Sequence, residues 1–465
     1  MARIGVTGLG TMGAALALNM ADNGFDVAVH NRTTSVTDDF MASTGGLAER
    51  FTAAEDLAGL VEALEAPRAV VIMVQAGGPV DSVIEALLPL LSEGDLIIDA
   101  GNADFNDTRR RTEHVTSNGI GFLGVGVSGG EEGARFGPSI MVGGTEALYE
   151  PIRDIIETIA AKYEESPCAA WLGPDGAGHF VKTVHNGIEY ADMQFIAEVF
   201  GILSATGRSY SEQSELFGDW NDGPLQSYLI EITAEILAAT DNDSGGSILD
   251  VIVDQAGQKG TGRWTVIEAL KLGQSATAIE AAVAARSWSA EKEARQAAET
   301  TFPAGLGAIE GVSDDDLEQA LLAARIIGYG QGLALLAAAS ENFEWNLDLA
   351  RIAEIWRAGC IIRSSLLDDI ASAARAGMPH GQLILAPDVA PRLAVAVEAL
   401  RRVVISAAKS GVPVPGLAAA LSYFDTYRRG RGTTNMIQAQ RDFFGRHGFE
   451  RTDRDGKGFH GPWDD

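Results

Sequence analysis

The sequence is poor in cysteine, and that scarcity excludes two kinds of protein. Its 465 residues include two cysteines, Cys168 and Cys360, which are too few and too far apart for a disulfide framework or a zinc site. The chain begins directly with a strand-like run, without the basic and apolar regions of a secretory signal. These features predict a reducing compartment, and we expect the protein to be cytoplasmic.

Basic residues are also scarce, since 35 Lys and Arg face 64 Asp and Glu, for a formal charge of -29. A nucleic acid partner needs basic stripes that follow its phosphates, so this balance argues against one. The simplest interpretation of the acidity is solubility. An anionic substrate would require the few cations to be concentrated at one site.

Long uninterrupted apolar runs are missing as well. The best candidate for a membrane span, Leu321 to Ala339, contains Arg325, Gln331 and several glycines. We interpret this stretch as a buried helix and expect no membrane partner. No ligand cluster with the spacing of a zinc site is present either, so we expect no metal.

The first 175 residues alternate short apolar runs with helical periodicity. Near-continuous Val and Ile runs are typical of parallel strands that are covered on both faces, so the pattern predicts a doubly wound, Rossmann-like α/β domain. The expected strands are 3–7, 26–30, 69–74, 95–99 and 120–127, and the expected helices are 14–23, 79–91 and 107–118.

Turn formers cluster in WLGPDGAG at 171–178, and beyond them a 3.6-residue periodicity dominates. We therefore expect a dinucleotide-binding domain at 1–176, a large all-helical domain at 177–434 and a C-terminal tail at 435–465. The segment YRRGRGTT at 427–434 is basic and rich in glycine, and the end of the chain is polar. Such a tail is either disordered or an arm that packs onto another subunit.

The run Gly8-Leu9-Gly10-Thr11-Met12-Gly13 follows the first expected strand and opens a helix. Its glycines allow a tight turn, a close approach to a pyrophosphate and close packing of helix on strand. The helix N-terminus then faces the phosphates. We expect dinucleotide binding, and a plain tight turn is the alternative.

The second expected strand ends in His30-Asn31-Arg32-Thr33, with no acidic residue to hold both ribose hydroxyls of NAD. Arg32, with Asn31 and Thr33 beside it, suits a 2′-phosphate, so we expect NADP rather than NAD. The alternative is an ordinary loop arginine.

A stripe of polar residues marks an otherwise apolar helical stretch. At about 100° per residue, Lys182, His185, Asn186 and Glu189 share one side of the expected helix. Ionisable groups there are costly unless they are paired or face a cleft. A site in a cleft and a solvated face with a Lys–Glu pair both remain open.

Further segments carry glycines where an anion could meet backbone N–H groups: Gly101-Asn102, VSGGEEGA at 127–134 and AGQKGTGRWT at 256–265. Taken with the motifs above, these segments make the chain resemble the 6-phosphogluconate dehydrogenase family from residue 8 to residue 445. VSGGEEGARFGP and KTVHNGIEY are the most specific segments. The others are GLGTMG, NRTTS, GNADFNDT, AGQKGTGRWT, WRAGCIIRS and QAQRDFFG.

The resemblance implies oxidative decarboxylation of 6-phosphogluconate to ribulose 5-phosphate and CO2 with reduction of NADP, a step of the pentose phosphate pathway and of gluconate utilisation. It implies Lys182 as the base and Glu189 as the acid, with Asn186 and His185 beside them. The cofactor residues that it implies are Gly8, Gly10, Thr11, Met12, Gly13, Asn31, Arg32, Thr33, Val74, Gln75, Ala76 and Asn102. A non-decarboxylating NAD(P)-dependent 3-hydroxyacid dehydrogenase is the alternative.

The substrate residues that the resemblance implies are Asn102, Ser128, Gly129, Gly130, His185, Asn186, Tyr190, Lys259, Thr261, Arg286, Arg441 and His447. Arg441 and His447 would reach the phosphate from the tail of a neighbouring subunit, which implies a homodimer formed through the helical domain. These cations would make a local basic pocket in an acidic protein. The chain departs from the family at Gln75, where many members have lysine, and at Gly432-Thr433-Thr434-Asn435.

Overall fold

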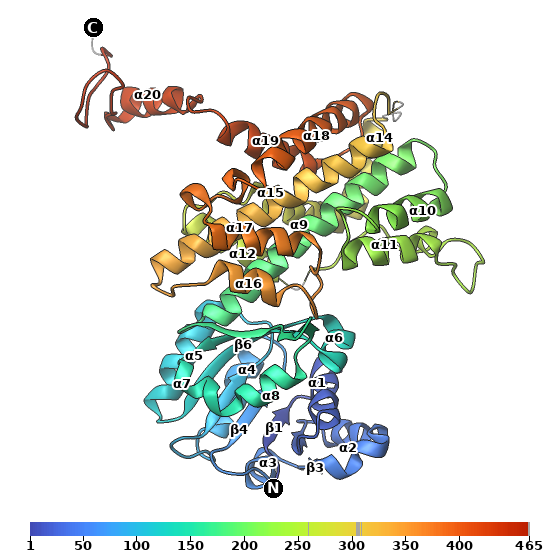
Figure 1. The fold of residues 1–465 in the computed structure, drawn as a ribbon, viewed down its shortest axis with the longest axis vertical. Coiled ribbons are helices and arrows are strands. Elements are labelled where there is room, and N and C mark those ends of the chain that lie inside the picture. The colour runs from blue at the N-terminus through green and yellow to red at the C-terminus, as the bar shows by residue number, and fades with distance from the viewer. Residues whose placement is uncertain (259, 304–306, 308, 464–465) are drawn as a thin grey trace.

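The computed structural model describes residues 1–258, 260–303, 307 and 309–463. A sheet domain lies at the N-terminal end, a helical body extends from it, and the last helix projects beyond that body (Figure 1). The strands are β1 (Ile4–Thr7), β2 (Val27–His30), β3 (Phe51–Ala53), β4 (Ala69–Ile72), β5 (Leu96–Asp99), β6 (Gly121–Ser128), β7 (Ser139–Gly144), β8 (Lys162–Tyr163), β9 (Ser166–Pro167) and β10 (Ala169–Gly173).

The helices of the sheet domain are α1 (Thr11–Asp22), α2 (Thr34–Ser43), α3 (Leu57–Glu62), α4 (Gly78–Leu87), α5 (Phe105–Ser117), α6 (Gly130–Phe136), α7 (Glu146–Tyr149) and α8 (Arg153–Ile159). Those that follow are α9 (Ala177–Ala205), α10 (Tyr210–Asn221), α11 (Tyr228–Ala238), α12 (Thr261–Lys271), α13 (Thr277–Ala290), α14 (Lys292–Thr301), α15 (Asp314–Asn342), α16 (Leu349–Ile355), α17 (Leu366–Ala376), α18 (Ala390–Ser410), α19 (Pro415–Tyr427) and α20 (Thr434–Gly445).

The main sheet has the strand order β10-β7-β6-β5-β4-β1-β2-β3. Strands β1 to β6 pair in parallel, and Val6 of β1 lies between Val29 of β2 and Val71 of β4. Neighbouring residues of one strand enter different apolar clusters, as Val70 and Val71 do. Helices therefore cover both faces, and the doubly wound fold that the sequence predicts is confirmed.

Three strands of this sheet were missing from the sequence prediction. β3 is only three residues long, and β7 (SIMVGG) ends in two glycines, so neither carries a clear strand pattern. β10 falls within the turn-rich stretch that marks the end of the first domain. β7 also runs antiparallel to β6, with Val142 opposite Val125, so the sheet is mixed at this edge.

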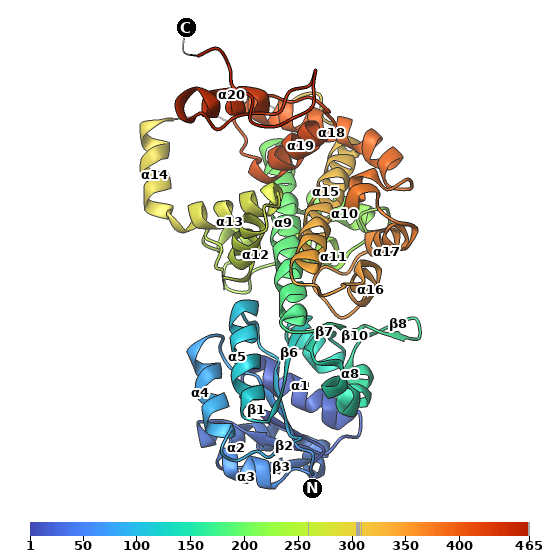
Figure 2. The ribbon, with the colours of Figure 1, turned by 90° about the vertical axis from the view of Figure 1, so that its left-hand side faces the viewer.

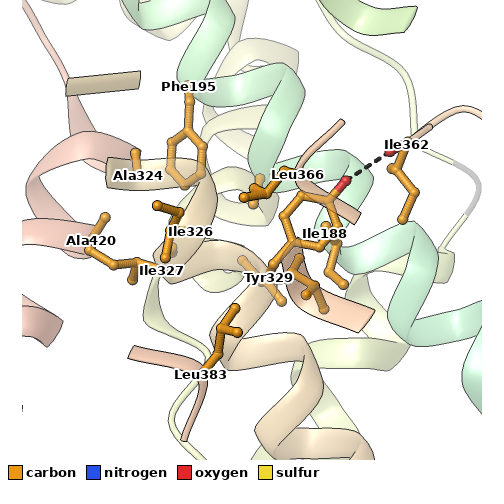
Figure 3. Close-up of a cluster of buried hydrophobic side chains, with 14 of the residues drawn as sticks. Ile188, Phe195, Ala324, Ile326, Ile327, Tyr329, Ile362, Leu366, Leu383 and Ala420 are labelled. Carbon is orange, nitrogen blue, oxygen red and sulfur yellow. Dashed lines mark hydrogen bonds between the residues drawn. The ribbon is translucent and has the colours of Figure 1, made fainter. Parts of the chain in front are cut away.

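The helical body is built around two helices of 29 residues, α9 and α15. α15 is the one helix of the described chain with the length and composition of a membrane span, and 94% of its most apolar window is buried inside the protein. It is thus a core helix, as the sequence predicts. Figure 3 shows its packing around Ile188 and Phe195 of α9, and its Tyr329 hydroxyl donates to the carbonyl of Ile362, between α16 and α17, at 2.8 Å.

Figure 2 shows α9 running from the sheet into the middle of the helical body. Its first turn meets the strands through glycine. A side chain at Gly178 would lie 2.5 Å from Met141 O and 2.6 Å from Gly124 O, and one at Gly126 would lie 2.4 Å from the Cβ atom of Lys182. Because Gly178 meets backbone atoms and Gly126 meets the base of the Lys182 side chain, the start of α9 is fixed closely on β6 and β7.

We expect Gly178→Ala to destabilise the protein by about 2 kcal/mol or more, because its methyl group would overlap backbone atoms that cannot move independently. Gly201→Ala is the matched control, since it lies on the same helix with no atom within 4 Å of the added carbon. That change should stabilise by about 0.5–1 kcal/mol through helix propensity. Urea unfolding of both variants measures the difference, and equal midpoints would contradict the proposed contact.

Candidate active site

Lys182 lies at the junction of the sheet and the helical body, one turn into α9, and only 6% of it is exposed. Its Nζ donates to Ser128 Oγ at 3.0 Å and to Asn186 Oδ1 at 2.8 Å, and it lies 3.4 Å from His185 Nδ1. No carboxylate of the described chain makes an ion pair with it. The amine is therefore buried among neutral hydrogen-bond partners, and the solvated-face interpretation of the stripe is wrong.

Burial shifts the pKa values of Lys182, His185 and Glu189 so that each side chain favours its neutral form. Burial lowers the pKa of the Lys182 amine, although the charge of Glu189 opposes that shift. Burial raises the pKa of the Glu189 carboxyl, with Lys182 and Arg286 opposing. Burial and the nearby Lys182 charge lower the pKa of His185 well below its ordinary value, so this imidazole is neutral. The stripe thus carries a weakened acid and a weakened base side by side.

The Ser128-Gly129-Gly130 turn forms the floor of the site at the end of β6. Ser128 Oγ lies 3.2 Å from His185 Nε2, so the serine joins the turn to α9. Gly129 has a φ of +121°, and a side chain there would lie 2.5 Å from the carbonyl oxygen of Gly359. Only glycine fits this position, and the turn keeps its backbone open toward the site.

The other end of the site lies where α12 crosses α9. Thr265 Oγ1 donates to Thr183 O at 2.7 Å, and Gly262 lies directly against the Tyr190 ring. The Arg286 guanidinium stacks on the other atoms of that ring, 3.4 Å from its centre. Thr261 is buried at the start of α12. Lys259, which the sequence predicts beside them, lies outside the described residues.

The glycine loop between β1 and α1 has the shape of a dinucleotide cradle. A side chain at Gly8 would lie 2.4 Å from Met73 O, and one at Gly13 would lie 1.9 Å from Gly8 O. α1 begins at Thr11 after Gly10, which has no side chain to cap it, and its first turn contains no acidic residue. The positive end of this helix is therefore open to a pyrophosphate.

The loop after β2 sits beside this cradle. Asn31 Oδ1 accepts from the backbone N–H of Leu9 at 3.1 Å, so Asn31 ties the two loops together. Arg32 and Thr33 are exposed at the end of the strand, and Val74, Gln75 and Ala76 follow β4 on the other side. Asn102 follows β5 at the same edge of the sheet and is also exposed.

Arg441 and His447 are not near this site within one chain. Arg441 lies on α20 and His447 follows it, and Figures 1 and 2 both show α20 at the end of the molecule opposite the sheet. Both residues are exposed, and Arg441 Nη1 donates to Gln438 Oε1 at 3.0 Å. Among the predicted site residues that the structure describes, this pair lies away from the sheet domain and the start of α9.

Two family comparisons cover almost the whole chain. Residues 3–173 match the NAD binding domain of 6-phosphogluconate dehydrogenase, and residues 178–463 match the 6-phosphogluconate dehydrogenase C-terminal domain. The chain belongs to the 6-phosphogluconate dehydrogenase family. The resemblance that the sequence motifs predict is therefore confirmed.

Full-length relatives agree with this membership. The decarboxylating 6-phosphogluconate dehydrogenase of Synechococcus elongatus is 47% identical over 99% of both chains. The NAD(+)-dependent decarboxylating enzyme of Bacillus subtilis is also 47% identical, again over 99% of both. The solved structure of the Plasmodium falciparum 6-phosphogluconate dehydrogenase superposes with a TM-score of 0.94 at 39% identity, covering 99% of this chain and 100% of that one.

Sequence reasoning assigned no role to the segment WRAGCIIRS, although it forms the rear wall of the site. The Trp356 ring packs edge-on against His185, with centres 5.5 Å apart, and the Gly359 carbonyl accepts from Ser139 N at 2.8 Å. Cys360 is completely buried behind Lys182. A glycine and a cysteine between Trp356 and Arg363, in an otherwise helical region, were the signal that could have identified this wall.

The tail was expected to be either disordered or an arm, and the described part of it is folded, so disorder is wrong there. Asp442 is completely buried and accepts four hydrogen bonds. Its Oδ1 accepts from Gly448 N at 2.9 Å and His460 Nδ1 at 2.7 Å, and its Oδ2 accepts from Gly461 N at 2.9 Å and Trp463 Nε1 at 2.6 Å. These bonds hold the pKa of the Asp442 carboxyl far below its ordinary value, and they fold the last residues back onto α20.

We expect Asp442→Asn to open this tail, because an amide cannot accept on both ends and would point donors at other donors. Trypsin should then cleave after Arg446 and Arg451 about tenfold faster, as mass spectrometry would show, while the melting temperature of the body stays unchanged. Asp453→Asn is the control, since Asp453 is exposed and its ion pair is with Arg451 in the same loop. Equal cleavage of the two variants would mean that Asp442 does not hold the tail.

Proposed function

We propose that the protein catalyses the NADP-dependent oxidative decarboxylation of 6-phosphogluconate to ribulose 5-phosphate and CO2. The observation that carries this proposal is the pair on the α9 stripe: an amine whose pKa is lowered and a carboxyl whose pKa is raised, both by burial. Such a pair supplies a base and an acid near neutral pH. The reaction needs one of each.

In the first step Lys182, in its neutral form, takes the proton of the C3 hydroxyl while the C3 hydrogen leaves as hydride. Bound NADP⁺ supplies the hydride acceptor. The lowered pKa of Lys182 makes the neutral amine accessible. Its bonds to Ser128 Oγ and Asn186 Oδ1 fix the direction in which its lone pair points. The ammonium that results can then donate to the new C3 carbonyl oxygen.

The second step is loss of CO2 from C1. The ammonium of Lys182 stabilises the negative charge that develops on the C3 oxygen, which is what a β-keto acid needs to decarboxylate. Glu189, whose pKa is raised by burial, then delivers its proton to the carbon that was C2 of the substrate and becomes C1 of the product. His185 lies 3.9 Å from Glu189 Oε2 and is neutral, so it can orient the substrate without competing as a cation.

Substrate placement follows from the two ends of the site. We assign the carboxylate end to Asn102 and to the Ser128-Gly129-Gly130 turn, whose open backbone suits an anion. The phosphate end is assigned to Tyr190, Thr261, Arg286 and Lys259, with Arg441 and His447 from a second chain. Arg286, already stacked on Tyr190, is held with little freedom left to lose on binding.

The domain limits of 1–176, 177–434 and 435–465 remain part of this proposal. They assign the cofactor to the sheet domain, the substrate and dimer contacts to the helical domain, and the completion of a neighbouring site to the tail. A cytoplasmic location belongs to the same proposal, supported by two free, buried cysteines.

The purified protein should reduce NADP⁺ and release CO2 in equal amounts when supplied with 6-phosphogluconate and no added metal. Lys182→Met should lose at least about 10³-fold in kcat while still binding the cofactor, because methionine fills the space but cannot take a proton. Absorbance of the reduced nicotinamide and trapped CO2 measure the two products. Reduction without CO2 would indicate a simple hydroxyacid dehydrogenase instead.

NADP preference is proposed on the strength of Arg32 and of the missing acidic residue after β2. Arg32→Ala should raise KM for NADP⁺ by about 10–100-fold, since a charge-assisted bond to a phosphate contributes about 1.5–3 kcal/mol, and should change KM for NAD⁺ little. Initial rates with both cofactors provide the comparison. Arg50→Ala, an exposed arginine paired with Asp26 in the same domain, is the control.

A homodimer with exchanged tails completes the proposal, and two uncovered apolar surfaces support it. One is a groove of about 1140 Å³ lined by Ile252, Val253, Trp288 and Val414. The other is on α20, where Met436, Ile437, Phe443 and Phe444 are 55–73% exposed. Exposed apolar surfaces of this kind mark protein contacts. In a dimer, the α20 surface of one chain could cover the groove of the other.

Tail exchange can be tested by mixing two inactive chains. In a mixed dimer of Lys182→Met and Arg441→Ala chains, the site with Lys182 intact would receive the intact Arg441 of its partner. We therefore expect co-expression to restore up to about half of the wild-type activity per mixed dimer, since one of two sites is whole. If each tail served its own chain, every site would lack one group and no activity would return.

A further inference from the structure

Arginines without a carboxylate partner are informative in a protein with 64 acidic and 35 basic residues. Most described arginines make an ion pair, including the buried Arg111 and Arg325. Arg32 and Arg286, proposed above to meet phosphates, make none with a described carboxylate. Arg363 shares that property, yet it has no place in the proposed reaction.

Arg363 lines a polar pocket of about 360 Å³ away from the α9 stripe. The pocket lies between the starts of α11 and α17 and the β8–β9 hairpin. Its walls are joined by the backbone: Tyr228 N donates to Arg363 O at 3.1 Å, and Ser365 N donates to Gln226 O at 3.1 Å. The pocket is therefore formed before any ligand arrives, which lowers the cost of binding.

The guanidinium of Arg363 is held in place, and several of its N–H donors remain without an acceptor in the described chain. It stacks on the Tyr228 ring, 3.7 Å from its centre, and its Nη1 donates to Cys360 O at 2.9 Å. Its other N–H groups have no acceptor among the described residues. A stacked fork with free donors is the arrangement that binds a planar or tetrahedral oxyanion through two parallel hydrogen bonds.

Other groups at the pocket favour negative charge as well. α11 and α17, each of 11 residues, begin there, and the side chain of Ser365, the N-cap of α17, makes no capping bond. The hydroxyl of Ser364 is buried against the Tyr329 hydroxyl and lies behind the pocket wall, whereas the Ser365 side chain is exposed. The Ser365 hydroxyl can therefore donate to a ligand.

Two carboxylates also line the pocket and restrict what it can hold. Asp368 accepts from Arg357 Nη1 at 3.0 Å and from the Tyr163 hydroxyl at 2.7 Å, so its charge is already matched. Glu231 lies exposed in the first turn of α11. Its carboxylate would repel a second anionic group but accept from hydroxyls.

We propose that this pocket is a second anion site, which binds the phosphate or carboxylate group of a small polyhydroxy compound. Arg363 binds the oxyanion together with the hydroxyl of Ser365, and Glu231 accepts from the ligand's hydroxyl groups. The site is separate from the proposed active site, because none of the α9 stripe lines it. Inorganic phosphate is the simplest probe of the shared chemistry.

Arginine modification can report on the pocket one residue at a time. The full-length protein is treated with phenylglyoxal at increasing inorganic phosphate, and mass spectrometry follows each arginine. At phosphate about tenfold above its Kd, the rate at Arg363 should fall about tenfold. Arg454 is the internal control, since it also stacks on an aromatic ring, that of Phe459, and lines no proposed anion site. Protection of Arg286 reports the active site independently.

Two substitutions at Ser365 sharpen the test. Aspartate and asparagine are both good N-caps, so each should preserve α17. Ser365→Asp adds a negative charge to the pocket and should abolish the protection of Arg363, whereas Ser365→Asn should keep it. The proposal is overturned if phosphate leaves Arg363 unprotected, protects Arg454 equally, or protects Arg363 equally in Ser365→Asp. Each of these results is independent of whether Arg286 is protected.

Discussion

Lys182 sits in the wall between sheet and helical body, where an amine with 6% exposure must be neutral or well bonded. The rest of the architecture around the site follows from that position. Gly126 leaves room for the stem of Lys182 beside β6, and Gly178 brings the start of α9 against the strands. Ser128 and Asn186 then occupy the space that water would otherwise fill. Removing water lowers the pKa of the Lys182 amine, and the close backbone contact is what removes the water.

The distribution of charged side chains follows a related constraint. A chain with a formal charge of -29 repels anions at long range. Local cations must therefore remain free of carboxylates wherever an anion is to bind. Arg32 and Arg286 meet that condition, and Arg286 is held by stacking on Tyr190 instead of by an ion pair. Arg363 is held on Tyr228 in the same way. Stacking fixes a guanidinium and leaves its charge available, which an ion pair does not.

Sequence reasoning reached the parts of this molecule whose pattern is local. The periodicity around Lys182 and Glu189 placed both on one helical stripe, and the Gly8–Gly13 loop fell between a strand and a helix as predicted. Sequence reasoning failed where an element is defined by contacts with distant parts of the chain. β7 has an apolar run of only three residues before its two glycines, and pairing with β6 extends it to a six-residue strand. The wall at Gly359 and Cys360 is defined by contacts with residues more than 170 positions earlier, as between Gly359 and Ser139.

The tail shows why composition alone is a poor guide to order. Its polar, glycine-rich sequence lacks an apolar core, yet one buried carboxylate replaces that core by accepting four donors. In the proposed dimer, a tail folded in this way would present Arg441 on a formed helix before it meets another chain. The entropy of ordering those residues is then lost on folding, not on association. An arm that arrives already folded can therefore contribute a cation to a neighbouring site with less loss of binding free energy than a flexible one.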